Sequence, residues 1–438
     1  MFLLYNILSF FLALLLLPLL PLIVIRKKYR DRILQRLGFG LAGHLTFLSR
    51  SLSPAPTFWI HALSVGEVTS ALPLVRGIRE VFPEARIVFS TTTRSGHQVA
   101  LQLLAPYIDA LIPGPIDLGP VVPFFIKTIR PDLFILVETD FWPNWLHSLA
   151  RRGIPLLLVN GRISRASFAR YQRYAFLCKP MFRNFTILSM QTAVDAEKIV
   201  ALGIDVNKVV TLGNLKFDTS QDLTSRMTDT PNGPTKESYG FNATAPLWIC
   251  GSTHRGEEQP LFQIFQQLRR TIPGLQLLIA PRNIERADEI VALGKTYHLH
   301  CRKWTEGKHR HGPILILDTI GELAGCYRMA DMVFIGGSLV PQGGHNPIEP
   351  ASAGIPVLFG PHMDDFAEIA AELVQNGGAR QVESAASLLS ALQQLFIDPA
   401  LHRSMAEAAG DCVKAHRGVV RKHLETITSL LSSNTTDE

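Results

Sequence analysis

The segment Phe334–Pro361, FIGGSLVPQGGHNPIEPASAGIPVLFGP, has the pattern of a strand, a glycine-rich loop, a short helix and a further strand. Gly336 and Gly337 directly follow the first apolar run and permit a close approach of the backbone to a ligand. Asn346 suits a helix N-cap, and Pro347 suits the first helical position. Because free N–H groups and the helix dipole favour phosphate at such a terminus, the segment predicts a phosphate or nucleotide site. An ordinary strand–loop–helix turn is the alternative.

The same alternation recurs along most of the chain. Short apolar or β-branched runs end in polar, glycine-rich turns and precede amphipathic helical stretches, which predicts parallel sheets with βα crossovers. A polar stretch rich in Thr, Ser, Gly and Pro divides the runs into two groups and has the composition of a linker. The sequence therefore predicts an α/β fold with Rossmann-like domains at 45–215 and 241–410, a linker at 216–240 and a C-terminal helix at 411–430. Two such domains facing a cleft form the GT-B architecture, which several classes of nucleotide-sugar enzyme share.

The composition sets broad limits on the class of protein. Of the 438 residues, 47% are hydrophobic and 18% are charged, so sizeable cores can form and most of the chain should be ordered. The formal net charge of +6 suits an anionic surface or substrate. The five cysteines are odd in number and lack a CxxC pair, and the 14 histidines show no metal-ligand spacing. This pattern indicates reduced thiols and predicts neither a disulfide framework nor a zinc site.

The N-terminus has the composition of a membrane anchor. Met1–Ile25 carries no charged side chain and is long enough to span a bilayer, and RKKYRDRILQR, which follows it, has six basic residues against one acidic residue. A cleaved secretory signal would instead need basic residues before the apolar core and small residues at a cleavage site after it. A retained anchor with its basic flank at 1–28 is therefore favoured, with the later domains on the cytoplasmic side. The basic flank can also bind acidic headgroups.

Ligands of open parallel sheets bind at the carboxyl ends of the strands. Charged, hydroxyl and glycine residues follow the predicted strands at Glu67, Thr91–Thr93, Glu138, Arg162, Lys216, Ser252–His254, Arg282, Asp318 and Gly336–Ser338. A carboxylate in a crevice, such as that of Glu138, is costly unless it is paired or used. Arg282 can bind phosphate oxygens or pair with Glu285. Lys216 can act in the site or be a solvated side chain beside the linker.

The tetrapeptide Ser64–Glu67, SVGE, follows the apolar run TFWIHAL and allows two interpretations. As part of a capping box, Glu67 would turn back onto the Ser64 backbone N–H. As a catalytic carboxylate, it would face the substrate from the strand end. Pro73 is expected to interrupt the helix soon afterwards, which argues against a plain helix start, and Ser64 and Gly66 would shape the turn. The tetrapeptide alone leaves both interpretations open.

A window without any acidic residue runs from Phe141 to Val194. Its basic residues are interleaved with aromatic and aliphatic ones and are Arg151, Arg152, Arg162, Arg165, Arg170, Arg173, Lys179 and Arg183. Such positive potential suits a membrane surface, a polyphosphate or phospholipid substrate, or nucleic acid, and the anchor favours lipid. A solvated basic face is the alternative.

From the N-terminal anchor to about residue 425, the chain resembles the 3-deoxy-D-manno-octulosonic acid (Kdo) transferases of lipid A biosynthesis. The resemblance rests on the motifs SVGE, ETDFWPN, LVNGRIS, GNLKFD, STHRGEE, PRNIER, DTIGEL and GGSLVPQGGHNPIE, in this order and spacing. It implies a GT-B fold, CMP-Kdo as donor and the tetraacylated lipid A precursor (lipid IVA), a bisphosphorylated disaccharide, as acceptor. It also implies action at the inner membrane without a metal or other cofactor, and no nucleic-acid partner.

The resemblance further implies roles for individual residues. Glu67 of SVGE would be the catalytic base, and Glu138 of ETD and Lys216 of NLKFD would stabilise the transition state. The CMP part of the donor would contact Pro281, Arg282, Ile320, Gly321, Glu322, Asn346, Pro347, Ile348 and Glu349. The chain departs from the family at Asn283 and Ile284, where His and Pro are usual, and at Asp140 and Phe141, where Glu and Leu are common, so donor affinity could differ.

The chemistry implied by these residues is direct attack of an acceptor hydroxyl on Kdo, which would invert the anomeric centre. A carboxylate would serve as general base, and hydrogen-bond donors would stabilise the departing phosphate. Two other functions remain open. A nucleotide-sugar epimerase would need neither the anchor nor the acid-free window, and a non-catalytic lipid-binding protein would not need the nucleotide loop.

Overall fold

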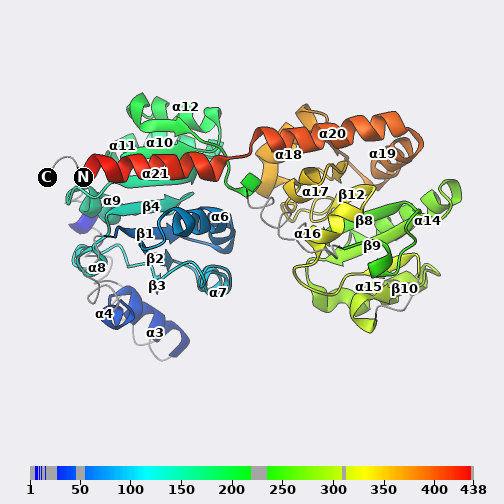
Figure 1. Ribbon diagram of the computed structural model, residues 1–438, viewed down its shortest axis with the longest axis horizontal. Coiled ribbons are helices and arrows are strands. Elements are labelled where there is room, and N and C mark those ends of the chain that lie inside the picture. Colours follow the sequence, from blue (N-terminus) through cyan, green and yellow to red (C-terminus); the bar gives the residue numbers. More distant parts are fainter. Residues whose placement is uncertain are drawn as a thin grey trace. The chain divides into compact units, whose positions relative to one another are not determined.

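The computed structural model describes residues 5–7, 9, 11, 15, 27–45, 55–218, 234–307 and 312–435, and the chain divides into two compact α/β units (Figure 1). The first unit comprises Met1–Thr219 and Gly418–Glu438, and the second comprises Ser220–Arg417. Each unit contains one seven-stranded parallel sheet. The predicted α/β class with two parallel-sheet domains is confirmed.

The sheet of the first unit has the strand order β3-β2-β1-β4-β5-β6-β7. Its strands are β1 (Thr57–Ala62), β2 (Arg86–Thr91), β3 (Ala110–Pro113), β4 (Leu133–Val137), β5 (Leu156–Gly161), β6 (Ile187–Met190) and β7 (Val209–Thr211). The order reverses between β1 and β4, which pair in parallel. Their carboxyl ends therefore flank a topological switch point, where doubly wound sheets bind ligands.

The helices of the first unit bury both faces of this sheet. Those with bounds in the described part of the chain are α3 (Lys27–Arg36), α4 (Leu41–His44), α6 (Val65–Val81), α7 (Arg94–Leu103), α8 (Val121–Ile129), α9 (Pro143–Ala150), α10 (Arg165–Arg173), α11 (Ala175–Phe182), α12 (Ala193–Ala201) and α21 (Val419–Thr435), with a 3-10 turn, η2 (Val206–Lys208). Trp59 of β1 packs in the core shared with α8 and α9, whereas Phe58 and Ile60 pack in the core shared with α6 and α21. This alternation along one strand places a core on each face.

Helix α21 returns the chain to the first unit after the second unit is complete. A Cβ added at Gly77 of α6 would lie 2.9 Å from the Leu424 side chain, so the missing side chain lets the two helices pack closely. Asp218 accepts the N–H groups of Gly418 and Val420 at 3.1 and 2.7 Å and fixes the start of α21. The prediction of one helix at 411–430 is therefore wrong, since α20 (Pro399–Ala415) ends before this return.

The expected interruption of the helix at Pro73 is also wrong. Helix α6 continues through Pro73 to Val81. Pro73, Leu74 and Val75 are all buried in the interior of the unit. Packing of this apolar face stabilises the helix enough to offset the hydrogen bond that proline cannot donate.

The sheet of the second unit has the order β10-β11-β9-β8-β12-β13-β14. Its strands are β8 (Leu247–Thr253), β9 (Gln276–Pro281), β10 (Cys301–Lys303), β11 (Ile314–Ile316), β12 (Met332–Ile335), β13 (Val357–Phe359) and β14 (Ala379–Gln381). Its α-helices besides α20 are α14 (Glu258–Thr271), α15 (Ala287–Thr296), α16 (Leu323–Cys326), α17 (Ile348–Ser352), α18 (Ala367–Gln375) and α19 (Ala385–Ile397). Short 3-10 turns lie at η3 (Glu237–Tyr239), η4 (Ile284–Arg286), η5 (Trp304–Glu306), η6 (Tyr327–Met329) and η7 (Asp364–Phe366). Here the switch point lies between β8 and β12.

Most of the predicted anchor, and residues 219–233 of the predicted linker, lie outside the described residues. Across the ranges that are described, none of the helices has the length and apolar character needed to cross a membrane. Tyr5, which falls within the predicted anchor, donates its hydroxyl to Asp117 of the first unit at 2.8 Å.

Candidate active site

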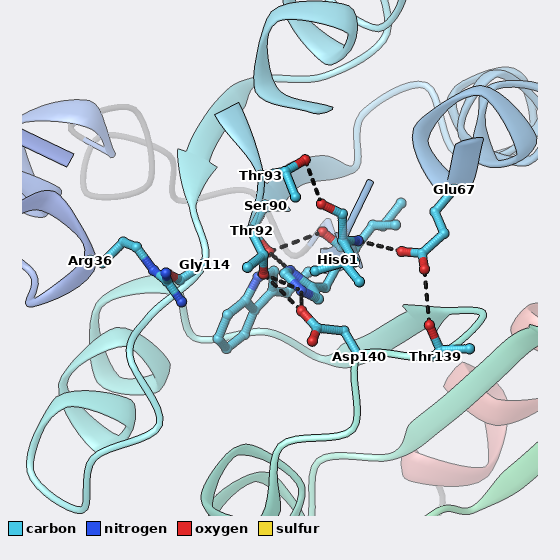
Figure 2. A network of polar contacts seen from close by, with 12 residues as sticks. Arg36, His61, Glu67, Ser90, Thr92, Thr93, Gly114, Thr139 and Asp140 are labelled. Carbon is cyan, nitrogen blue, oxygen red and sulfur yellow. Dashed lines mark hydrogen bonds and ion pairs between the residues drawn. The ribbon is translucent and has the colours of Figure 1, made fainter. Parts of the chain in front are cut away.

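Glu67 lies on the first turn of α6, where its carboxylate joins the ends of β1 and β4 (Figure 2). One carboxylate oxygen accepts the backbone N–H of Leu63, and the other accepts the hydroxyl of Thr139 at 3.0 Å. Ser64 is the N-cap of α6, but its side chain makes no capping hydrogen bond. A capping box would place Glu67 on the N–H of Ser64, whereas Glu67 binds the N–H of the preceding residue, Leu63. Through Thr139, Glu67 also holds the turn after β4.

The surroundings of Glu67 make its carboxyl group a weak acid. Glu67 is only 4% exposed. Burial, and then the charge of Glu138, raises the pKa of Glu67 from 4.5 to about 8, although the hydrogen bonds from Leu63 and Thr139 act in the opposite direction. A carboxyl group whose pKa lies near the working pH is suited to general base catalysis.

Glu138 and Asn160 hold an unusual backbone at the ends of β4 and β5. Both have left-handed φ angles, of 61° and 58°. For residues with a side chain this costs on the order of 1–3 kcal/mol and persists where the surroundings fix it. Asn160 Nδ2 donates to Glu138 Oε1 at 2.8 Å, and Asn160 Oδ1 accepts the N–H of Leu215 at 3.0 Å.

These hydrogen bonds bring the segment after β7 to the same edge of the sheet. Lys216 follows Leu215 directly, is half-buried, and donates its backbone N–H to Asn214 Oδ1 at 3.0 Å. The three predicted catalytic residues, Glu67, Glu138 and Lys216, therefore lie at the carboxyl edge of the first sheet. The hydrogen bonds of Thr139 and Asn160 hold the segments that carry them.

Asp140 is fixed by a buried network that the sequence did not indicate (Figure 2). Its Oδ2 accepts the hydroxyl of Thr92 at 2.7 Å and lies 2.9 Å from His61 Nε2, while His61 Nδ1 lies 2.7 Å from Ser90 Oγ. Burial acts to raise the pKa of Asp140, but His61 and Thr92 stabilise its charge and hold that pKa below its usual value. Since Asp140 follows Glu138 and Thr139, this network immobilises the turn that supports Glu67.

Two arginines of α3 also lie at this edge. Arg32 donates to the carbonyl of Thr92 at 2.5 Å, and Arg36 donates from Nε to the carbonyl of Gly114 at 2.9 Å. Burial, and then the charges of Arg36 and Arg94, lowers the pKa of Arg32, so both of these cations lie close enough to act on the Arg32 guanidinium. The sequence predicted that this basic flank borders an anchor and can also bind lipid headgroups, whereas these two arginines point toward the sheet. Their spacing of four residues, which places both on one face of a helix, was the feature of the sequence that could have indicated this shared orientation.

The acid-free window includes α9, the buried strands β5 and β6, and the helices α10 and α11, which carry most of its exposed side chains. Tyr174 is 46% exposed and Phe176 is 68% exposed, and the guanidinium of Arg173 lies 5.8 Å from the Tyr174 ring centre. Arg170 and Arg173 are exposed on the same stretch. This part of the first unit therefore combines cations with exposed aromatic rings.

The glycine-rich loop of the second unit differs from its prediction. Glu257 accepts the N–H groups of His254, Gly337, Ser338 and Leu339 at 2.8 to 3.1 Å. A Cβ at Gly336 would lie 2.4 Å from the Ser252 carbonyl oxygen. Gly336 therefore permits a close approach of the loop to β8 and not to a ligand. The N–H groups of Gly337, Ser338 and Leu339 bind the buried carboxylate of Glu257, so they are already used within the protein.

Arg282 provides an exposed cation beside this loop. His254 Nε2 lies 2.8 Å from His345 Nε2, and the two rings are stacked. Burial, and then His254 and Arg282, lowers the pKa of His345 to about 4. Arg282, His254 and His345 therefore lie together at the carboxyl edge of the second sheet, and sequence reasoning had not singled out His345.

The remaining predicted donor contacts surround this cluster. Asn346 Oδ1 accepts the N–H of Ile348 at 3.1 Å, and its Nδ2 donates to Glu349 Oε1 at 3.2 Å. Helix α17 begins at Ile348 and has five residues, so Asn346 and Pro347 precede the helix instead of forming its cap and first residue as predicted. The side chains of Pro281, Pro347 and Ile348 are buried.

The loop after β11 is open. Ile320 is 85% exposed, and Gly321 has a φ of 95° with no atom near the position of a Cβ. Glu322 accepts the hydroxyl of Thr319. Because β11 neighbours β9, this loop lies at the same sheet edge as Arg282.

Comparison with known proteins identifies the family. A family model described as 3-deoxy-D-manno-octulosonic-acid transferase (kdotransferase) matches residues 31–219. The chain is 31% identical over 413 residues to the 3-deoxy-D-manno-octulosonic acid transferase of Haemophilus influenzae, a match that covers 93% of each chain. The chain belongs to the Kdo transferase family. It is therefore a glycosyltransferase, as the motifs implied.

Solved structures show the fold of this Kdo transferase at lower sequence identity. A UDP-GlcNAc 2-epimerase from Neisseria meningitidis has a TM-score of 0.59 at 13% identity, covering 84% of this chain and 100% of its own. A glycosyltransferase from Rickettsia africae has a TM-score of 0.55 at 15% identity, covering 86% and 99%. The two units therefore resemble those of GT-B enzymes, and this fold is shared with epimerases.

Proposed function

We propose that this Kdo transferase moves Kdo from CMP-Kdo onto a hydroxyl group of lipid IVA, with inversion at the anomeric carbon and without a metal ion. The observation that carries the proposal is the buried carboxyl group of Glu67, whose pKa is raised to about 8 at the switch point of the first sheet. A sugar hydroxyl must lose its proton as it attacks, and Glu67 would be the base that accepts this proton.

In the proposed step, the acceptor oxygen forms a bond to the anomeric carbon of Kdo while the bond from that carbon to the phosphate oxygen of CMP breaks. The electron pair of the broken bond leaves with CMP, and the proton of the hydroxyl passes to Glu67. Positive charge develops on the sugar, so the carboxylate of Glu138 would stabilise the transition state. The ammonium group of Lys216 would compensate the negative charge of the Glu138 carboxylate.

The residues around Arg282 in the second unit would bind CMP. Arg282 can donate two hydrogen bonds to the phosphate, and exposed Ile320 offers an apolar surface to the base. Glu349 could accept hydrogen bonds from ribose hydroxyls. Because Glu257 uses the N–H groups of the loop at Gly337, we assign the phosphate to Arg282 and to the backbone near Asn346.

The cations beside Glu67 would bind the phosphates of the acceptor. Arg32 and Arg36 lie at the edge that carries the base, and the charge of Arg94 acts on Arg32. Helices α10 and α11, with the exposed rings of Tyr174 and Phe176, would contact the bilayer surface. We further propose that the N-terminal anchor holds the enzyme on the cytoplasmic side of the inner membrane.

The test is to incubate the purified chain with CMP-Kdo and lipid IVA, measure CMP release, and measure the mass and anomeric configuration of the lipid product. The proposal expects CMP release, a lipid heavier by whole Kdo residues, and a configuration opposite to that of the donor. CMP release without a mass gain would indicate a hydrolase, and retained configuration would refute direct displacement. Arg282→Ala is the matched control, since it should raise the donor KM while leaving the unfolding transition unchanged.

A further inference from the structure

Three metal-ligating side chains of different chemistry meet in the second unit, on the helices α18 and α20. Glu372 lies on α18, Cys412 lies one turn before the end of α20, and His416 is the C-cap residue of α20. The thiol sulfur, an imidazole nitrogen and a carboxylate oxygen of these residues all lie within 4.8 Å of one another. The sequence predicted no zinc site because Glu372 is contributed by another helix, 40 residues earlier.

The hydrogen bonds of His416 determine the state of its ring. His416 Nδ1 lies 2.9 Å from the carbonyl oxygen of Cys412. A carbonyl oxygen only accepts, so Nδ1 carries a hydrogen. The other ring nitrogen, Nε2, faces the Glu372 carboxylate at 2.9 Å. The backbone carbonyl therefore sets the orientation of the ring, with Nε2 on the side of Glu372.

The same hydrogen bond is the usual support of a metal-binding histidine. Histidine ligands commonly donate their second ring N–H to a backbone carbonyl, which fixes the ring and makes the other nitrogen a better ligand. His416 is held in this way by the residue that supplies the thiol. The imidazole is thus oriented toward Glu372 and Cys412 before any cation binds.

Cys412 supplies a buried thiol behind the two more exposed ligands. Burial, and then the charge of Glu372, raises the pKa of Cys412 to about 11, and Asn376 Nδ2 lies 3.8 Å from Sγ. The side chains of Glu372 and His416 are 34% and 31% exposed, so solvent reaches the cluster from their side. A divalent cation can displace the thiol proton because coordination favours the thiolate.

We propose that Glu372, Cys412 and His416 bind a divalent transition-metal cation of the Zn²⁺ class, with a fourth position left to water. Thiolate, imidazole and carboxylate ligands suit Zn²⁺ and Co²⁺. Tetrahedral bonds place such ligand atoms roughly 3.3 to 3.6 Å apart, so side-chain shifts of about 1 Å complete the site. The cation would join α18 to the last turn of α20, directly before the chain leaves the second unit at Arg417. None of these three residues is among those assigned to Kdo transfer.

The test is Co²⁺ titration of the chelator-treated full chain, monitored by absorption. One equivalent of Co²⁺ should give visible bands of tetrahedral cobalt and a thiolate-to-cobalt charge-transfer band, and Zn²⁺ should displace it. Cys412→Ser and His416→Gln should abolish the charge-transfer band. Cys178→Ser, which removes a thiol of the first unit, should retain it.

Further measurements keep the proposal testable if Cys412→Ser or His416→Gln fails to fold. Glu372→Gln changes a partly exposed ligand and should weaken Co²⁺ binding roughly tenfold or more while circular dichroism stays unchanged. Zn²⁺ should also raise the melting temperature of the wild-type chain but not that of Cys412→Ser. Absence of a charge-transfer band in the wild type, or its persistence in Cys412→Ser, would overturn the proposal.

Discussion

Replacing Glu67 by Gln should change how the stability of the first unit depends on pH. Gln has the shape of the protonated carboxyl group, and it can keep both contacts, with its oxygen accepting the Leu63 N–H and its amide donating to the Thr139 hydroxyl. The substitution therefore removes the ionisation of Glu67 while preserving the packing of α6.

The magnitude follows from the pKa of Glu67, which rises from 4.5 to about 8 on folding. One pKa unit corresponds to about 1.36 kcal/mol, so ionising Glu67 costs the folded state at most about 5 kcal/mol more than the unfolded state. Between pH 4.5 and about 8 the unfolded chain has released this proton and the folded chain has retained it. Folded stability therefore falls as the pH rises through this window, and the loss is complete above the folded pKa.

The assay is urea unfolding at a series of pH values from 5 to 9, followed by the fluorescence of the buried Trp59 and Trp145. The free energy of unfolding of the wild type should fall by up to about 4 kcal/mol relative to Glu67→Gln as the pH increases across this range. Glu80→Gln, an exposed change on the same helix, is the control and should run parallel to the wild type within about 0.5 kcal/mol. If the Glu67→Gln curve also runs parallel to the wild type, the carboxyl group is not a weak acid and the reasoning fails.

Three further predictions concern the residues around the two sheet edges. Glu138→Gln removes a negative charge that raises the pKa of Glu67, so the rise of kcat/KM with pH should move to lower pH, whereas an unchanged midpoint would show that the two carboxyl groups do not interact. Asn160→Ala removes the hydrogen bonds to the Leu215 N–H and to Glu138 and should cost about 1–3 kcal/mol in urea unfolding, with a lower kcat and an unchanged donor KM. Glu257→Gln places an amide among four backbone N–H groups and should lower the stability of the second unit by about 2–3 kcal/mol, and an unchanged melting temperature would contradict the contacts described here.

Much of the fold was predictable because single segments carry its signals. The buried strands are continuous apolar runs. Glu138 follows one of them directly and Glu67 lies on the helical turn after another, so the carboxyl-edge rule located both. The resemblance to Kdo transferases then supplied roles that the residues alone left open. The finding that both side chains lie at one switch point required the strand order.

The features that were missed depend on contacts between distant segments. His61, Thr92 and Asp140 come from three strand ends and meet only because β2, β1 and β4 are neighbours. Glu257 fills the loop at Gly337 from a position 80 residues earlier, so the glycines suggested a ligand where an internal carboxylate lies. Similarly, nothing in residues 411–430 indicated that the helix after Gly418 packs against Gly77.

The most direct test of the central claim is the single-turnover rate of Kdo transfer by Glu67→Gln at saturating CMP-Kdo and lipid IVA, with donor affinity measured alongside. If Glu67 is the general base, the rate should fall by roughly 10²–10⁴-fold while CMP-Kdo binding stays at the wild-type level. A variant that transfers Kdo at close to the wild-type rate would contradict the account and would leave Glu67 with a structural role at the start of α6.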